Sequence, residues 1–541
     1  MFASNDNTGI EFQFSFNNPF HVALSGDGFL QNYILNSFEY QYRKDILPKI
    51  DESRFDVLYS KKDSRPNFPI NIMLSAYWFC SFYGISEGAF CDRVMTDIKL
   101  RYALGLEDVI GETPLCERTM QRFRDRCVSY EEETGRDLLH EAVVDISKIM
   151  KENMGIDGRN QRQDSMMIEA HIKKLSRLGL LYTCNQNMVK EFSKNDEAID
   201  EALLHYLKAG DRNEVSYHSD LSNGEKIVVV LKEARKILDL AGDKYTESQN
   251  YKNLTRVLRE QCNVDEDGNY TLKEKGDPSL DASIMQSPVD PDATFRSKAG
   301  KQHRGYVADM VEEVGENGGI ITDYSVEQNI HSDIDFEKES LEKAEVFPED
   351  APAKRVVDGA YYSDETAKMA GEKNINLEPT NLTGKDTQDI HADFVFSDDG
   401  REVMQCPEGN KPESTSYDET SGQCTAQFQA GTCANCKHKE ECKAKCTKDS
   451  DKVRTSAKSK NRAEKQRSRG TEEFRENSHF RNGVESRPSL MRRYGRADEL
   501  PVHGLNRIRF FFGNRIAGRN LRTYAVYCSQ RDKCAQKQEA A

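Results

Sequence analysis

The sequence has 541 residues, of which 37% are hydrophobic and 31% are charged. A chain of this length can form three or four domains of ordinary size with real hydrophobic cores. The longest apolar stretch, residues 68–83, is interrupted by polar residues and is shorter than the roughly 20 residues that a membrane-spanning helix needs. The composition therefore excludes an integral membrane protein, and the stretch is expected to be a buried helix.

The N-terminus, MFASNDNTGIEF, has neither the basic segment nor the apolar segment of an export signal. We therefore expect a soluble protein of the cytoplasm. In that compartment the 14 cysteines should be mostly reduced thiols or metal ligands rather than disulfides.

The net charge of −15 hides a strong asymmetry along the chain. Residues 443–522 contain 22 Lys and Arg against 9 Asp and Glu, a local charge of +13, which leaves −28 for the rest. Such a split suggests a basic C-terminal region that meets a polyanion. An ordinary solvated helical face would give the same count, so charge alone does not decide.

Residues 1–153 are predicted to form a helical N-terminal domain. Pro69 begins a run of apolar residues at helical spacing, and Gly84 ends it. Residues 112–128 have an Arg-rich face, and residues 137–154 place Leu, Val and Ile on one stripe. There is no clean helix-turn-helix signature, so DNA binding and a plain helical domain are both open interpretations of this part.

The periodicity changes after Asp157, and residues 154–400 are expected to form an α/β core with a helical insertion at about 173–265. Residues 262–300 are rich in turn residues, and a helix is expected over 335–345. The expected strands are residues 163–171, 304–313, 319–327 and 354–358, of which the second and third form a hairpin and the last ends in an aspartate.

The C-terminal part begins with a cysteine-rich insertion, residues 401–450, which we expect to be a loop region. A basic region, residues 451–541, follows and is expected to complete the core. Its first part, within residues 448–471, is polar, which favours a partly mobile segment. Residues 472–523 are helical in pattern, with breaks expected at Pro488 and at residues 501–504.

Three acidic residues stand at informative places: Asp164 in the first strand, Asp358 at the end of the last, and Glu485 in the late helical segment. This order is expected of an RNase H-like core, which gathers carboxylates from distant parts of a chain. Mg²⁺ prefers oxygen ligands. Two such ions about 3.5–4 Å apart can stabilise the attacking and leaving oxygens of a phosphoryl displacement. The chain has 91 acidic residues, so spacing alone leaves many other triads open.

Four blocks of sequence narrow the choice. They are RQDSMMIEAHIKKLSRLGLLY (residues 162–182), SPVDPDATFRSKAGKQHRGYVADMVEE (287–313), RVVDGAYYSDE (355–365) and RNGVESRPSLMRRYGRADELPVHGLNRIRFFFGNRIAGRNLR (481–522). They resemble consecutive blocks of bacterial insertion-sequence DDE transposases, in the branch with a helical N-terminal domain and a cysteine-rich insertion before the final Glu. The resemblance covers about residues 154–523.

The resemblance implies that Asp164, Asp358 and Glu485 are catalytic and hold Mg²⁺ or Mn²⁺. It also implies an RNase H-like catalytic core, whose three carboxylates we expect on one face of a five-stranded mixed sheet. The alternatives are Asp157 for the first position, Asp364 for the second, and Glu476 or Glu499 for the third.

Basic residues around Glu485 are expected to bind DNA phosphates. They are Arg481, Arg487, Arg492, Arg493 and Arg496. A second group, Lys298, Lys301 and Arg304, has the same possible role, but a solvated loop is the favoured interpretation of these residues. The resemblance further suggests that His303 and Tyr306 lie near the site.

Six cysteines fall within residues 406–446, and Cys433 and Cys436 form a CxxC pair. Such a pair presents two thiolates to one tetrahedral ion, and zinc accepts that geometry without penalty. We expect Cys406, Cys433, Cys436 and Cys442 to bind one structural Zn²⁺, with Cys424 and Cys446 as alternative ligands. Reduced thiols without a metal are the other interpretation.

The function that follows is transposition of DNA. A homodimer or higher assembly would bind the terminal inverted repeats and target DNA, and would associate with the nucleoid when bound. One rival hypothesis is a catalytically inactive DNA-binding descendant. Another is a nucleic-acid-binding protein that works through its cysteine knuckle. A separation of more than about 10 Å between the carboxylates of Asp164, Asp358 and Glu485 would favour this second rival.

Overall fold

The computed structural model of the chain describes residues 2, 29–62, 66–106, 115–213, 215, 220–298, 300–380 and 386–539. It describes the backbone alone at residues 29–31, 213, 485, 486, 494, 533 and 535–539. Apart from Phe2, the N-terminal stretch MFASNDNTGIEF lies outside the described residues, as do residues 112–114 of the expected helix 112–128.

The N-terminal region is helical, as its periodicity predicts. Its helices are α2 (Phe29–Leu35), α3 (Phe38–Asp45), α4 (Ile70–Tyr83), α5 (Glu87–Thr96), α6 (Ile98–Ala103), α7 (Glu117–Thr134) and α8 (Leu138–Asn153). Helix α4 is the apolar stretch, and it is buried along nearly its whole length. It ends where Gly84 takes a left-handed conformation (φ 70°), which glycine adopts without steric cost. None of the helices in the described ranges is long and apolar enough to cross a membrane.

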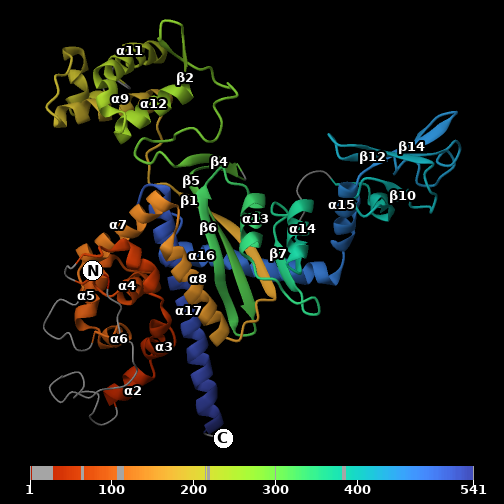
Figure 1. Cartoon of the computed structure of the whole chain (residues 1–541), viewed down its shortest axis with the longest axis horizontal. Helices are drawn as coiled ribbons and strands as arrows, with labels where there is room; N and C mark the ends of the chain where they lie inside the picture. The colour runs from red at the N-terminus through yellow and green to blue at the C-terminus, as the bar shows by residue number, and fades with distance from the viewer. Residues whose placement is uncertain are drawn as a thin grey trace.

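A mixed sheet lies at the centre of the molecule (Figure 1). Its strands are β1 (Asn160–Glu169), β4 (Thr294–Lys298), β5 (Lys301–Gly315), β6 (Gly318–Gln328), β7 (Ala353–Val357) and β8 (Ile375–Pro379). Strand β5 pairs antiparallel with β1 and β6, and β7 pairs parallel with β1 and β8. The described sheet thus has six strands, one more than expected, because residues 294–298 pair with the start of β5.

Different helices cover the two faces of the sheet. Side chains alternate along a strand, so Arg162 and Gln163 of β1 point to opposite faces. Helices α13 (Asp333–Lys343) and α14 (Asp364–Glu372) lie on the side of Gln163. Helix α16 (Glu472–Gly495) lies on the side of Arg162, whose guanidinium donates to the Phe480 carbonyl.

The long helix α17 (Leu505–Glu539) joins the N-terminal helices to the sheet, since it packs against α4, α8 and β6. Two glycines allow the close approach. A Cβ atom on Gly513 would lie 2.3 Å from the Tyr324 hydroxyl, and one on Gly518 would lie 2.5 Å from Cβ of Ser81. The N-terminal helices consequently share one hydrophobic core with β1, β5, β6 and α17.

The helical insertion follows β1 and has a hydrophobic core of its own. It contains α9 (Arg177–Lys194), α11 (Asn223–Ala241), α12 (Gln249–Gln261) and a small hairpin of β2 (Cys262–Val264) and β3 (Tyr270–Leu272). Figure 1 shows it beyond one end of the central sheet. The prediction of helices over this segment is confirmed.

The cysteine-rich region is a small sheet rather than the loop that we expected. Its strands are β9 (Val395–Phe396), β10 (Val403–Gln405), β11 (Ser414–Asp418), β12 (Gln423–Gln429), β13 (Lys445–Cys446) and β14 (Ser450–Thr455). Strand β12 carries alternating buried residues, Cys424, Ala426 and Phe428, and these pack against Val453. Burial of that face drives strand formation despite the polar composition.

Two further expectations about the C-terminal region were wrong. The basic segment after β14 is ordered as α15 (Ala457–Ser468), because Ser456 caps its first turn and Lys465 and Arg467 pair with acidic residues elsewhere. Pro488 does not end a helix but lies inside α16. The buried side chains Val484 and Met491 hold the helix in place on both sides of the proline. The break around residues 501–504 is present as expected.

Candidate active site

Asp164 and Asp358 come from neighbouring strands of the sheet. Strands β1 and β7 run parallel, with Asn160 opposite Lys354 and Arg162 opposite Val356. Two further residues along that register bring Asp358, which follows the last residue of β7, level with Asp164. Both side chains belong to the face covered by α16, since side chains two residues apart share a face.

One guanidinium bridges the two carboxylates. Nη2 of Arg481, in α16, lies 3.3 Å from Oδ1 of Asp164 and 3.5 Å from Oδ2 of Asp358. The separation between the two carboxylate oxygens is at most the sum of these two distances. That sum is well below the separation of about 10 Å beyond which a shared site is excluded. Arg481 is only 9% exposed, so this meeting point is largely shielded from solvent.

Helix α16 is fixed to the strands by polar contacts on either side of the aspartates. Lys354 of β7 donates to Oδ1 of Asn477 at 2.9 Å, and Nη1 of Arg162 donates to the Phe480 carbonyl at 2.8 Å. Gly483 makes room for this arginine, because a Cβ atom there would lie 1.9 Å from Nη1 of Arg162. Any larger residue at position 483 would therefore displace the Arg162 guanidinium from this contact.

Glu485 lies in α16, one turn after Arg481. Residues four apart lie on the same side of a helix, so the backbone of Glu485 is on the side that faces the two aspartates. Its side chain lies outside the described residues.

The alternative acidic residues have other surroundings. Asp157 is exposed and pairs with Arg159, and Asp364 is exposed and accepts a hydrogen bond from Asn461. Glu476 and Glu499 are exposed, and Glu499 pairs with Arg496. Within the described part of the chain, none of these four carboxylates contacts the pair of aspartates.

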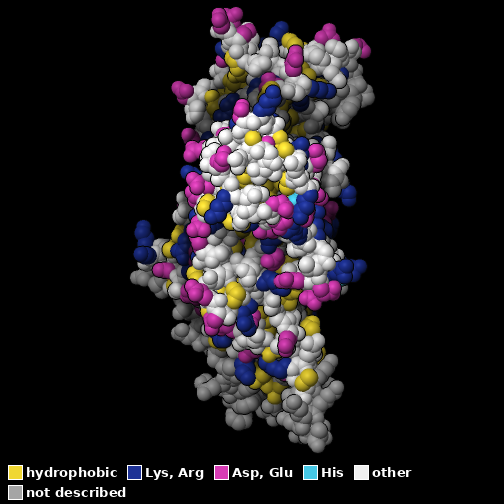
Figure 2. All heavy atoms as spheres, turned by 90° about the vertical axis from the view of Figure 1, so that its right-hand side faces the viewer, with side chains coloured by type: hydrophobic (Ala, Val, Ile, Leu, Met, Phe, Trp, Pro, Cys, Tyr) yellow, Lys and Arg dark blue, Asp and Glu magenta, His cyan; other side chains and the backbone are white. Residues whose placement is uncertain are grey.

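Two of the expected DNA-binding arginines lie inside the protein. Besides Arg481, Arg487 binds Oε1 of Glu312 at 2.5 Å, and Glu312 is completely buried and also binds Arg162 at 2.8 Å. The other three, Arg492, Arg493 and Arg496, are exposed near the end of α16. On the face of the molecule drawn in Figure 2, basic and acidic side chains are interspersed rather than gathered by sign.

His303 and Tyr306 lie seven and four residues before Met310, the partner of Asp164 in β5. His303 pairs with Glu169, and Tyr306 donates to Asp290. Asp290 and its neighbour Asp292 accept hydrogen bonds from the backbone at the start of α17. This part of the 287–313 block therefore anchors a helix. Lys298 and Lys301 are exposed, and Arg304 lies over the Phe295 ring.

A buried aspartate that the sequence did not single out supports the loop after Asp358. Asp309 of β5 accepts hydrogen bonds from Tyr361 at 2.7 Å and from Gln163 at 2.8 Å. Complete burial raises its pKa well above the ordinary value. Tyr361 is thereby tied to the sheet three residues after Asp358. The AspGlyAlaTyr sequence at 358–361 is the only signal that could have indicated this link.

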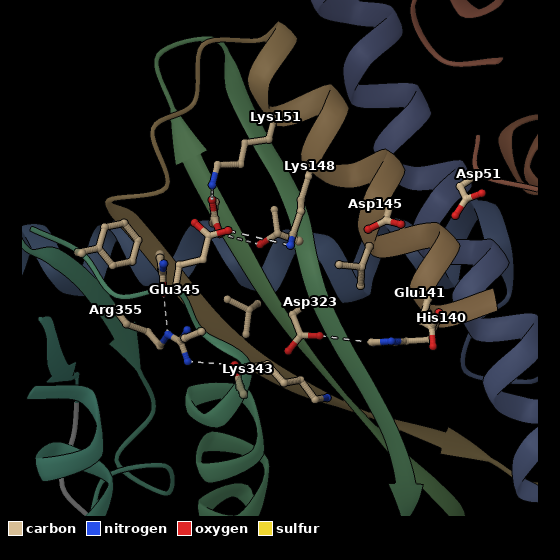
Figure 3. A pocket seen from close by; sticks show the side chains of 18 of the residues that line it. Asp51, His140, Glu141, Asp145, Lys148, Lys151, Asp323, Lys343, Glu345 and Arg355 are labelled. Carbon is tan, nitrogen blue, oxygen red and sulfur yellow. Dashed lines mark hydrogen bonds and ion pairs between the residues drawn. The ribbon is translucent and has the colours of Figure 1, made fainter. Parts of the chain in front are cut away.

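A cavity of about 510 Å³ lies between α8 and α13, on the side of the sheet to which Gln163 points (Figure 3). Its charged side chains pair with one another, as in Lys151 with Glu313 and His140 with Asp323. Because its charges are balanced internally, this cavity does not resemble a site for a strongly charged ligand.

Four cysteines meet in the insertion. Cys406, Cys433, Cys436 and Cys442 all line one small cavity, of about 20 Å³, together with His438. Burial raises the pKa of Cys433 to about 11 and that of Cys442 to about 12, and the charges of neighbouring groups add to this effect.

The two alternative ligands do not line this cavity. The Cys424 thiol donates to the carbonyls of Gly400 and Arg401. Cys446 lies in β13, close enough for its charge to act on Cys433. Where the structure describes side chains, no group of three or more His, Cys, Asp or Glu residues has the arrangement of a formed metal site.

Comparison with known families gives matches to two parts of the chain, one in the N-terminal helices and one in the C-terminal region. Residues 38–126, which contain α3 to α6 and most of α7, match the family described as Transposase domain (DUF772). Residues 405–525, which contain α16 with Arg481 and Glu485, match the family described as Transposase DDE domain. No curated protein and no solved structure matches the chain. The two family matches support a DDE transposase of the insertion-sequence type.

Proposed function

We propose that this transposase cleaves DNA at the ends of an insertion sequence and joins the freed ends to target DNA. The observation that carries the proposal is the meeting of Asp164 and Asp358 on Arg481, in the helix that also contains Glu485. We propose further that the protein acts as a homodimer or a higher assembly, since an element has two ends.

The arrangement of strands supports an RNase H-like core. Three antiparallel strands, β6, β5 and β1, are followed in the sheet by the parallel strands β7 and β8. The first acidic residue is in β1, the second follows β7, and the third position is in a helix on the same face. This is the order that the fold uses to gather carboxylates around catalytic metal ions.

The residues at the site fit divalent metal ions. Asp164, Asp358 and Glu485 would hold Mg²⁺ or Mn²⁺, which prefer carboxylate oxygens. The Arg481 guanidinium already supplies the two aspartates with one positive partner, so the site favours cations. When bound, two such ions stabilise the attacking and leaving oxygens of an in-line phosphoryl displacement.

The chain's own residues would position DNA around that chemistry. In the first step water attacks the phosphorus and the 3′ oxygen leaves as a hydroxyl group. In the second, that hydroxyl attacks a phosphodiester of the target and displaces the 3′ oxygen of the target strand, which leaves as a hydroxyl group, so no protein nucleophile is consumed. Arg481 holds the aspartates in register, and the exposed Arg492, Arg493 and Arg496 bind backbone phosphates near the helix that carries Glu485.

The aspartates can be tested with matched variants. Asp358→Asn removes a metal ligand without adding bulk, so cleavage of DNA bearing the element's ends should fall by more than about 100-fold in Mg²⁺, beyond the loss typical of outer-shell residues. DNA binding should remain close to wild type. Asp364→Asn is the control, because that carboxylate is exposed and only six residues away. Equal cleavage by the two variants would reject Asp358 as a ligand.

We also propose that Cys406, Cys433, Cys436 and Cys442 bind one structural Zn²⁺. Their common cavity supports this ligand set over one that includes Cys424 or Cys446. Thiols with raised pKa values are protonated at neutral pH, so zinc binding would release protons and contribute to the folding of the insertion.

Metal analysis of purified variants tests the zinc site. Wild type and Cys446→Ser should contain one zinc per chain, while Cys436→Ser should lose it and be less stable. A wild-type protein without zinc, whose thiols all react freely, would reject the site. Loss of all DNA affinity in Cys436→Ser, with Asp358→Asn fully active, would instead favour the rival function through the cysteine knuckle.

A further inference from the structure

A cavity of about 180 Å³ lies between α4, α16 and α17, apart from the two aspartates. This volume is about six times the ~30 Å³ that one water molecule occupies in the liquid. We call it the arginine cavity, and its lining residues are Ser81, Leu490, Met491, Gly495, Arg515, Arg519 and Arg522.

The three arginines converge because of their spacing and of the close packing of α17. Positions 515, 519 and 522 follow one side of the helix. Gly518 brings this part of α17 against the end of α4, where Arg515 donates to the Ser81 hydroxyl at 3.1 Å and Arg522 to the Phe82 carbonyl at 2.6 Å. On the opposite wall, the absence of a side chain at Gly495 leaves room for the stem of Arg515.

Positive charge in the cavity exceeds the negative charge around it. Among side chains that the structure describes, Arg519 has neither a hydrogen bond nor an ion pair, and the Nε atoms of Arg515 and Arg519 are buried without a partner. Among the described carboxylates, Glu312 acts on Arg519, and it already binds Arg162 and Arg487. Buried N–H groups without acceptors cost free energy, and like charges add to that cost.

The protonation of the cluster agrees with this imbalance. Burial, and then the charge of Arg487, lowers the pKa of Arg519 to about 10. Burial likewise lowers the pKa of Arg515 below the ordinary value for arginine. Both remain cationic at neutral pH, so an anion that entered the cavity would meet donors already in place.

We propose that the arginine cavity binds a phosphate group of the DNA backbone during transposition. Guanidinium groups present paired N–H donors that match phosphate oxygens, and they remain charged in partly buried sites. Leu490, in the cavity wall, follows Arg481 by nine residues, or roughly 14 Å along α16. That distance spans about four phosphates of one DNA strand. The cavity would hold the strand a few nucleotides from the bond that is cut.

This inference rests on the proposed function, and binding rather than cleavage tests it. Each phosphate contact contributes about −0.9 to the slope of log K against log salt concentration. Arg519→Gln should therefore reduce that slope by about one and weaken binding of end-bearing and random duplexes equally. The control is Arg507→Gln, which removes an exposed arginine of the same helix away from the cavity. Its slope should stay close to wild type.

Thermal unfolding in inorganic phosphate against chloride of equal ionic strength separates DNA from free phosphate as the ligand. In chloride, Arg519→Gln should be at least as stable as wild type, because a buried charge without a partner is removed. A phosphate-dependent stabilisation that the variant loses, with an unchanged DNA salt slope, would make this an inorganic anion site and overturn the proposal. An unchanged slope without such stabilisation would also overturn it. Loss of cleavage in Asp358→Asn tests the proposed function and does not depend on the outcome for the arginine cavity. A wild-type protein that binds no DNA would refute the proposed function itself.

Discussion

Arg481 is the side chain at which the separate segments of the candidate site meet. It lies in α16, yet its guanidinium contacts one aspartate in β1 and another just after β7. Each carboxylate is less than one third exposed, at 17% for Asp164 and 32% for Asp358. In such partly buried surroundings two carboxylates close together repel one another, and the arginine offsets that repulsion until metal ions are present.

This role predicts a specific response of stability to Mg²⁺. Without metal, Arg481→Gln should be about 1–3 kcal/mol less stable than wild type, since two carboxylates lose their charged partner. Mg²⁺ should stabilise the variant more than the wild type, because the ions no longer compete with the guanidinium. Urea unfolding with and without Mg²⁺ measures both effects. Arg481→Lys serves as the control that keeps the charge, and an identical response to Mg²⁺ in all three proteins would contradict this role.

Some site residues were predictable from sequence and others were not. Asp164 lies in β1 two residues before the apolar run Met166–Ile168, and Asp358 directly follows the apolar end of β7, so their place in a sheet could be inferred from local pattern. The contact of Arg481 with both could not, because it depends on how α16 crosses the strands, where Arg162 and Lys354 bind the helix. Arg481 and Arg487 were expected to face DNA, and the structure instead pairs them with Asp164, Asp358 and Glu312 inside the protein.

At the scale of elements, α8 is joined to the sheet through a histidine. Nε2 of His140 lies 3.4 Å from Oδ1 of Asp323 in β6 and 3.0 Å from the Tyr324 carbonyl (Figure 3). Burial lowers the pKa of His140, but the hydrogen bond and charge of Asp323 outweigh it and leave the pKa raised. Asp137 adds to this effect and Lys343 of α13 opposes it. Burial raises the pKa of Asp323, but His140 together with the charges of Lys343 and Arg355 outweighs it and leaves that pKa lowered.

The pair should therefore stabilise the protein in a definite pH range. A raised histidine pKa stabilises below its unfolded value of about 6.5, and this is lost as the pH rises through the folded pKa. A lowered aspartate pKa stabilises above about 3.9, and this is lost as the pH falls through the folded pKa. His140→Gln should cost about 1 kcal/mol at a pH near 5.5 and clearly less near 8.5. Urea unfolding at both values checks this, and a cost independent of pH would exclude an ionic contact.

Elements with a buried face were recognised from sequence, and elements with polar surroundings were missed. Strands β5, β6 and β7 alternate or are continuously apolar, so their periodicity was clear. In the insertion, β11 is almost wholly exposed, and only three residues of β12 are buried. Helix α15 has a single buried residue, Ala463, and no apolar stripe. Such elements are stabilised by their neighbours, which local sequence does not specify.

On the scale of the whole molecule, the N-terminal helices and the sheet form one packed unit. Their common core includes Trp78 of α4, Met166 of β1 and Phe512 of α17. The separate helical domain expected for residues 1–153 therefore shares its interior with the central sheet. Hydrophobic periodicity shows that a helix has an apolar face, but it does not show which distant element covers that face. The long contact between α4 and α17 illustrates this limit.

We propose that three distant segments combine into one metal-dependent DNA-cleaving site. Glu485 is the residue of that site whose role has the least structural support, since its side chain lies outside the described residues. The most direct measurement is cleavage of a duplex bearing the element's end, in Mg²⁺ and in EDTA, by Glu485→Gln and Glu476→Gln. Both residues lie in α16, and Glu476 is exposed, so the pair is matched for helix and charge.

Wild type and Glu476→Gln should cut the duplex in Mg²⁺ and not in EDTA. Glu485→Gln should bind it with near wild-type affinity and cut it more than about 100-fold more slowly, as expected for loss of a metal ligand. Cleavage in EDTA, or equal cleavage by the two variants, would show that Glu485 does not hold a catalytic metal ion.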